Sequence, residues 1–202
     1  HIYEKCGLAD NYSTFLDFIS KIESAVAIGS ILYKPNIVGV VGSTLAKEII
    51  AESDSQISVK RLVQQLVLNM YTGPSIDLGI CFNRDSGITG LTKERGLPLA
   101  RLLMEKVQNT NLVKRVIKEK NVETFSIDEL IELGQLLSVD EIPKDERELL
   151  LDIIIPADPR PSGWNNDIRR IATYTFLLQL ADDNKSLPAI DAYFDVLSKP
   201  SK

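Results

Sequence analysis

A glycine-rich stretch in the middle of the chain, TGPSIDLGICFNRDSGITGLTKERG at residues 72–96, holds the side chains best suited to bind a ligand. Arginine guanidinium groups hold carboxylates and phosphates, and glycines let backbone N–H groups approach an anion. Binding residues also concentrate in polar loops on a rigid scaffold. The stretch therefore predicts a site for a small anionic ligand, or for an acidic group of another protein, formed by Arg84, Asp85, Ser86, Thr89 and Arg95.

The same stretch also fits an ordinary turn between two strands. In NRDSG, at residues 83–87, aspartate and serine can bond their own backbone, and glycine supplies a positive φ. Turn chemistry accounts for every residue of the stretch except its arginines. We favour the turn, and the ligand site stays open as the alternative.

A second candidate surface comes from the distribution of charge. Residues 92–121 carry a net charge of +5, and residues 122–152 carry a net charge of −8. The two segments could neutralise each other within one fold, meet between subunits, or leave the basic segment to face nucleic acid. We favour the first, since neighbouring charged helix faces are usually partners, and the basic segment lacks interleaved aromatic residues for base stacking. The interaction surface predicted from this pattern comprises Arg101, Lys106, Lys114, Arg115, Lys118, Glu129, Glu132, Asp145 and Glu148.

Histidine and cysteine are scarce, which limits the chemistry open to the chain. The one histidine is residue 1, and the two cysteines are Cys6 and Cys81. Nucleophiles activated by histidine, and zinc sites built from several histidine or cysteine ligands, are thereby excluded. We predict no catalytic residue, no metal site and no cofactor, and we expect a reducing, cytoplasmic compartment.

The segment GVVGSTLAKE, at residues 39–48, fits a phosphate-binding loop only in part. Such a loop needs a lysine directly before its serine or threonine to reach the phosphates. Lys47 lies too far along the segment, and the third glycine of a dinucleotide-binding motif is missing. We interpret Gly39 and Gly42 as small residues that allow close packing between helices.

The elements that must position these groups are mostly helices. SVKRLVQQLVLNMYTG, at residues 58–73, spaces its apolar residues as a half-buried helix does, and Gly73-Pro74 is expected to end that helix. Ser126 and Glu129 form a capping box in front of another helix. The same periodicity predicts helices over residues 13–33, 97–108, 110–121, 126–137, 143–155 and 165–183, and one that begins at Ser186.

The predicted helix over residues 165–183 is apolar on most of its sides between Ile171 and Leu180. A helix that is apolar all round is normally enclosed by the rest of the protein. We therefore expect it to be the most buried helix, with Tyr174 and Phe176 in the core.

Two segments do not have a clear helical pattern. From Ile76 to Phe82, apolar residues alternate with other residues, as they do in a strand. Residues 36–50 fit either a buried strand that leads into a helix or a single helix with two glycines, and periodicity does not separate the two.

Together these patterns predict a mainly α fold: about eight helices around a single core, with a possible short strand or hairpin near 76–82. We expect one helical domain over residues 1–202, with a possible subdivision into 1–72 and 97–202 around the glycine-rich loop at 73–96.

For function, we expect a soluble, non-enzymatic helical module that acts by protein–protein interaction or self-association. Nucleic acid is disfavoured because the whole chain carries a net charge of −5. Membrane insertion is disfavoured because the longest uncharged run, residues 62–76, is shorter than the ~20 apolar residues of a membrane helix. The alternative is a protein or enzyme that binds a small anionic ligand with the loop at 72–96.

Overall fold

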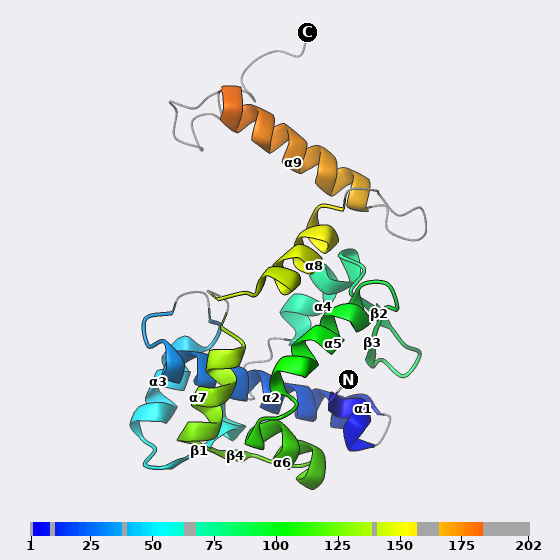
Figure 1. Cartoon of the computed structure of the whole chain (residues 1–202). Helices are drawn as coiled ribbons and strands as arrows, with labels where there is room; N and C mark the ends of the chain where they lie inside the picture. The colour runs from blue at the N-terminus through cyan, green and yellow to red at the C-terminus, as the bar shows by residue number, and fades with distance from the viewer. Residues whose placement is uncertain are drawn as a thin grey trace. The chain divides into compact units, whose positions relative to one another are not determined.

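The computed structural model describes residues 2–8, 11–37, 40–62, 68–138, 141–156 and 166–183. As predicted, this part of the chain is mainly α-helical, with nine α-helices and two small antiparallel sheets (Figure 1). The chain divides into two compact units, residues 1–150 and 151–202. The elements in chain order are α1 (Ile2–Cys6), α2 (Tyr12–Tyr33), α3 (Ser43–Ala51), β1 (Gln56–Ser58), the 3₁₀ turn η1 (Val59–Arg61), α4 (Leu68–Asp77), β2 (Cys81–Asn83), β3 (Thr89–Leu91), α5 (Gly96–Val107), α6 (Asn111–Glu119), β4 (Thr124–Ser126), α7 (Ile127–Leu136), α8 (Lys144–Ile154) and α9 (Asn166–Asp183).

Helix α2 is the central element of the first unit, and α7 packs closely against it. The side chain of Asn11 caps the start of α2 by accepting a hydrogen bond from the Thr14 backbone N–H at 2.9 Å. The predicted capping box of Ser126 and Glu129 is present at the start of α7. The two helices cross at Gly29 and Gly134, where a Cβ atom on either glycine would overlap backbone atoms of the other helix. Glycine is required at this crossing because the two backbones touch.

The core of the first unit surrounds this helix pair. Strand β1 pairs with β4 in an antiparallel sheet that sets Ile57 opposite Phe125, and both side chains are fully buried. The apolar residues that come from α2, α6 and α7 in the same cluster include Phe15, Phe18, Ala25, Ile28, Ile31, Leu112, Val113, Val116, Leu130 and Leu133.

The predicted end of a helix at Gly73-Pro74 is wrong. Helix α4 continues through Pro74 to Asp77. It ends instead at Gly79, which has a φ of 67°, and the backbone N–H groups of Gly79 and Ile80 donate to the carbonyls of Ile76 and Ser75, both at 2.8 Å. This pair of hydrogen bonds is a Schellman motif, and it needs a residue of positive φ, which glycine adopts without strain.

The helix predicted over residues 58–73 is only partly matched by the structure. Its first residues form the 3₁₀ turn η1, whose Val59 is fully buried, and its last residues lie in α4. Residues 63–67 lie outside the described residues.

A hairpin forms near the predicted position. Strand β2 pairs with β3, and Phe82 lies opposite Gly90. Gly87 supplies the positive φ of the turn, at 79°. The strand begins at Cys81 rather than at Ile76, because the Schellman motif still belongs to the end of α4.

Helix α3 begins at Ser43, directly after Gly42, which has a φ of 76°. The described part of residues 36–50 is therefore a loop and a helix. Gly39 lies outside the described residues.

In the second unit, α9 forms where it was predicted, but the expectation that it is the most buried helix is wrong. The residues from position 172 to 179 are all exposed, and Leu178 reaches 69% exposure. Apolar composition predicted burial here, and the described residues of the second unit do not cover this part of the helix. The predicted last helix from Ser186 lies outside the described residues.

Candidate functional site

The five side chains predicted to bind a ligand in the glycine-rich loop contact different parts of the fold. Arg84 donates to Glu4 in α1 at 2.9 Å. The Arg95 side chain is fully buried at the start of α5 and donates to the Leu78 carbonyl at 2.7 Å. The two arginines therefore attach the hairpin and the end of α4 to the fold. The remaining three lie in the hairpin, with Asp85 and Ser86 exposed in its turn and Thr89 in β3.

The basic and acidic segments meet within the first unit. Arg115 in α6 binds both carboxylate oxygens of Glu129 in α7, at 3.0 and 2.7 Å, and its guanidinium lies 5.3 Å from the centre of the Phe125 ring. Lys106 in α5 bonds Glu146 in α8. These ion pairs use three of the nine residues of the predicted charged surface for contacts inside the fold.

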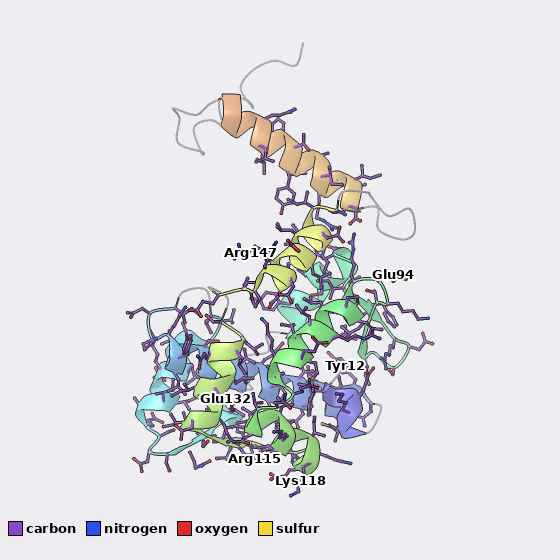
Figure 2. All side chains as sticks on the ribbon, in the orientation of Figure 1. Tyr12, Glu94, Arg115, Lys118, Glu132 and Arg147 are labelled. Atoms are coloured by element: carbon purple, nitrogen blue, oxygen red, sulfur yellow. The ribbon has the colours of Figure 1, made fainter. Side chains whose placement is uncertain are left out.

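The other six residues of that surface are exposed (Figure 2 labels two of them). Lys118 lies on α6 and Glu132 lies on α7. Glu148 pairs with Lys144 along α8 at 3.6 Å, an exposed contact that contributes little to stability. The remaining exposed members are Arg101, Lys114 and Asp145.

Glu129 has a shifted pKa that follows from its contacts. Burial alone would raise it, but hydrogen bonds from Ser126 and Arg115 stabilise the carboxylate, so the pKa of Glu129 lies below its ordinary value. This carboxylate is therefore charged and fully engaged at neutral pH, and it acts as a structural group.

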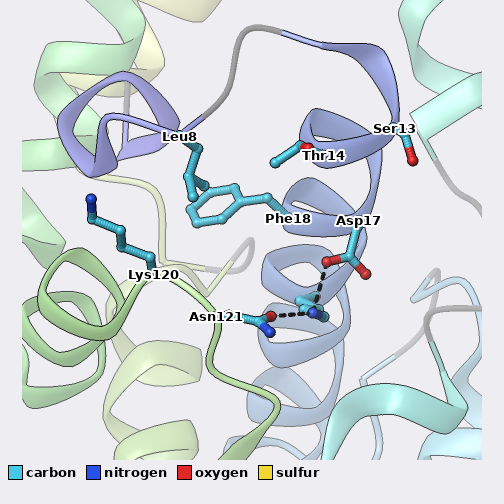
Figure 3. Close-up of a pocket in the computed structure, with 8 residues that line it drawn as sticks. Leu8, Ser13, Thr14, Asp17, Phe18, Lys120 and Asn121 are labelled. Atoms are coloured by element: carbon cyan, nitrogen blue, oxygen red, sulfur yellow. Dashed lines mark hydrogen bonds and ion pairs between the residues drawn. The ribbon is translucent and has the colours of Figure 1, made fainter.

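A cleft lies between the first turns of α2 and the turn that follows α6 (Figure 3). Its volume is about 430 Å³, and polar and apolar groups contribute equally to its walls. Leu8 and Phe18 lie side by side, while Lys120 and Asn121 enter from the turn after α6 (Figure 3). We call it the α2–α6 cleft, and its lining residues are Leu8, Ser13, Thr14, Asp17, Phe18, Lys21, Lys120 and Asn121.

Lys21 joins α2 to the segment after α6. Its ammonium group contacts Asp17 at 2.7 Å, Asn121 at 2.6 Å and Glu123 at 3.0 Å. Burial disfavours the charged form, but the hydrogen bonds to Asp17 and Glu123 outweigh this effect, and the pKa of Lys21 is raised. Because an ammonium group has three donors, Lys21 is saturated.

Lys120 has an unusual backbone conformation. Its φ is 65°, the only positive φ outside glycine in the described residues. The Asn121 N–H donates to the Glu119 carbonyl at 2.8 Å, so Lys120 is the central residue of a γ-turn. A non-glycine residue in such a conformation costs about 1–3 kcal/mol. The turn places two successive side chains, Lys120 and Asn121, on the same cleft.

Neither cysteine is activated as a nucleophile. Burial raises the pKa of the Cys6 thiol, which the nearby Lys120 charge opposes only in part, and burial also raises the pKa of Cys81. A thiol with a raised pKa is a poor nucleophile at neutral pH. Within the described ranges, no three His, Cys, Asp or Glu residues are grouped so as to hold a metal ion.

Helix α9 presents large apolar side chains to solvent. The exposed fraction is 65% for Ile168, 37% for Tyr174, 45% for Phe176 and 42% for Leu177. The start of the helix is fixed by a bond from Arg170 to Asp167, whose side chain is fully buried. The helix therefore has an ion pair in its first turn and exposed apolar side chains along its length.

Comparison with known proteins yields no relative. No family model matches the chain, and no curated protein and no solved structure matches it. Among the helices of the described residues, none is both long and apolar enough to span a bilayer.

Proposed function

We propose that the chain is a protein–protein interaction module that self-associates through helix α9. The observation that carries the proposal is the row of exposed apolar side chains along this helix. Contiguous exposed apolar surface on a protein marks an interaction site. The sequence contains no recognisable set of catalytic residues that would favour an enzymatic function instead.

Four of the apolar side chains of α9 form a stripe that suits helix pairing. Ile168, Ile171, Tyr174 and Leu178 follow one another at intervals of three or four residues, so they lie along one side of the helix. Three of them are exposed, and Ile171 is partly covered. Burying one such side chain contributes about 1.5–3 kcal/mol, so four on each helix suffice for a measurable association.

Symmetry favours a second copy of the same helix as the partner. A closed twofold pair buries the same stripe on both copies, so one patch on the chain supplies both halves of the interface.

The charged segments of the first unit support an interface less well. Lys106, Arg115 and Glu129 already bond partners inside the fold. Exposed single charges contribute little to binding affinity because water and salt screen them. The apolar stripe of α9 therefore supports association better than the charged surface does.

Sedimentation of the full chain over a wide concentration range tests the proposal. We expect a monomer–dimer equilibrium that Leu178→Glu weakens by at least about tenfold, since the apolar contact of one leucine is lost and each 1.4 kcal/mol is a factor of ten. Thr173→Glu is the matched control. It places the same charge on the exposed far side of α9 and should leave the equilibrium unchanged.

A wild-type chain that stays monomeric at every concentration would overturn the proposal, because α9 would then be covered by the chain itself or by a different protein. Equal weakening by Leu178→Glu and Thr173→Glu would also overturn it.

A further inference from the structure

We infer that the α2–α6 cleft binds a small organic anion whose carboxylate or phosphate group contacts Lys120. This site goes beyond the proposed self-association, and it lies in the other unit of the chain. The cleft volume of about 430 Å³ falls within the range of roughly 300–1,000 Å³ typical of small-molecule sites.

The two lysines of the cleft have different roles. The three donors of Lys21 are used by Asp17, Asn121 and Glu123, and Glu123 also lies 3.9 Å from the exposed Lys60. Lys120 is exposed, and its ammonium group has no hydrogen-bond acceptor or carboxylate partner among the described residues. Lys120 therefore remains as the cation that can bind an anion from solution.

Asn121 supplies a second, oriented donor. Its side-chain oxygen accepts from Lys21 at 2.6 Å. Because a lysine ammonium only donates, this bond fixes the oxygen of the amide on Lys21 and leaves the amide NH₂ group to donate elsewhere. The γ-turn at Lys120 thus presents an ammonium group and an amide donor from adjacent residues of one turn.

The start of α2 adds to the positive potential of the cleft. Ser13 and Thr14 of its first turn line the cleft, and the N-terminal end of a helix carries a partial positive charge. The residues that line the cleft carry two positive charges, on Lys21 and Lys120, and one negative charge, on Asp17.

The apolar part of the wall limits the type of anion. Leu8 and Phe18 lie together on the cleft (Figure 3). A ligand that bears an apolar body next to its anionic group can contact these two side chains and Lys120 at the same time. Inorganic phosphate alone would leave the apolar wall unused, so it should bind more weakly than an aromatic anion.

Titration calorimetry of the full chain with four probes tests this site. The probes are benzoate, phenyl phosphate, inorganic phosphate and the neutral benzyl alcohol. We expect benzoate or phenyl phosphate to bind more tightly than the other two, and the tighter of these two identifies the anionic group. If neither binds better than benzyl alcohol, the inference is wrong. If inorganic phosphate binds as tightly as phenyl phosphate, the predicted contact of the ligand with Leu8 and Phe18 is wrong.

Lys120→Asn separates ligand binding from structure. Asparagine tolerates positive φ better than lysine does, so the variant should be as stable as the wild type or slightly more so. It removes the ammonium group, and we expect binding of the aromatic anion to weaken about fivefold. Lys118→Asn is the matched control, since it removes an exposed lysine of α6 that does not line the cleft.

The variants give clear outcomes. Selective weakening by Lys120→Asn supports the site. Unchanged binding in Lys120→Asn, or an equal loss in Lys118→Asn, overturns it, because long-range attraction by net charge would then explain the binding. Neither variant touches α9, so this result is independent of the dimer measurements.

Discussion

Helices α2 and α9 are both long and rich in apolar residues, yet one is enclosed and the other is exposed. Helix α2 has 22 residues and packs against α7 in the first unit. Helix α9 has 18 residues, and its large side chains face solvent. An apolar sequence therefore predicts that a helix will be covered, but it does not identify the surface that covers it.

The two helices also differ in the size of the side chains on their packing surfaces. The buried residues of α2 include the small Ser20, Ser24 and Gly29, and Gly29 lets α7 approach closely. The Ser24 hydroxyl donates to the Ser20 carbonyl at 2.7 Å, so this hydroxyl keeps a hydrogen-bond partner although it is buried. Helix α9 instead presents Tyr174 and Leu178 on its exposed stripe, which suits an interface between larger side chains.

The sharpest test of this contrast is the same substitution in both regions. Leu130 in α7 is fully buried, so Leu130→Ala should lower the free energy of unfolding by about 2–5 kcal/mol. Leu178→Ala in α9 should change it by less than about 0.5 kcal/mol in dilute protein, since the side chain is exposed. Urea unfolding followed by circular dichroism measures both.

The outcome that contradicts the contrast is a similar loss in the two variants. A large effect of Leu178→Ala at the lowest protein concentration would mean that α9 is covered within the monomer. The proposal of self-association would then lose its basis.

The glycine crossing of α2 and α7 gives the next largest effect. Gly134→Ala places a Cβ atom against the backbone of Gly29, and the helices must separate, which should cost about 1–3 kcal/mol. Gly73→Ala is the matched control in α4, where an added Cβ meets no atom within 4 Å. It should stabilise the protein by up to about 1 kcal/mol, because alanine favours a helix. Equal thermal shifts in the two variants would contradict the close crossing.

Local patterns predicted most of the helices. The periodicity and caps of α2, α5, α6 and α7 are read from residues close together in the chain, and these helices form within a residue or two of the predicted ranges. The end of α4 was missed because the sequence holds two stop signals, Gly73-Pro74 and Gly79, and only the second has the positive φ of a helix end. The exposure of α9 was missed because composition does not report what covers a helix.

The candidate sites were harder to predict than the helices. Arg84 and Arg95 were predicted as binding residues from their residue type. Their contacts with Glu4 and with the Leu78 carbonyl depend on the three-dimensional fold. The α2–α6 cleft has no local signal, because Lys21 and Asn121 are 100 residues apart in the chain. Only a turn after α6 that carries Lys120 at positive φ brings these groups together.

The smallest expected effect concerns the ion pair between Arg115 and Glu129, and it appears as a pH dependence. Glu129 has a pKa below its ordinary value of 4.5, so the charged form stabilises the fold. That contribution is complete above pH 4.5 and is lost as the pH falls through the lower pKa of the folded state. Glu129→Gln should therefore cost about 1.5 kcal/mol at neutral pH, and the difference from the wild type should shrink in acid.

Urea unfolding at a series of pH values measures that difference, and Glu132→Gln serves as the control, because Glu132 is exposed on the same helix. The control should stay within about 0.5 kcal/mol of the wild type throughout. A difference for Glu129→Gln that stays constant from neutral pH into acid would mean that the carboxylate charge is not what Arg115 and Ser126 stabilise. The first unit would then be stabilised by shape and burial alone. It would differ from α9 only in how well its apolar side chains are covered.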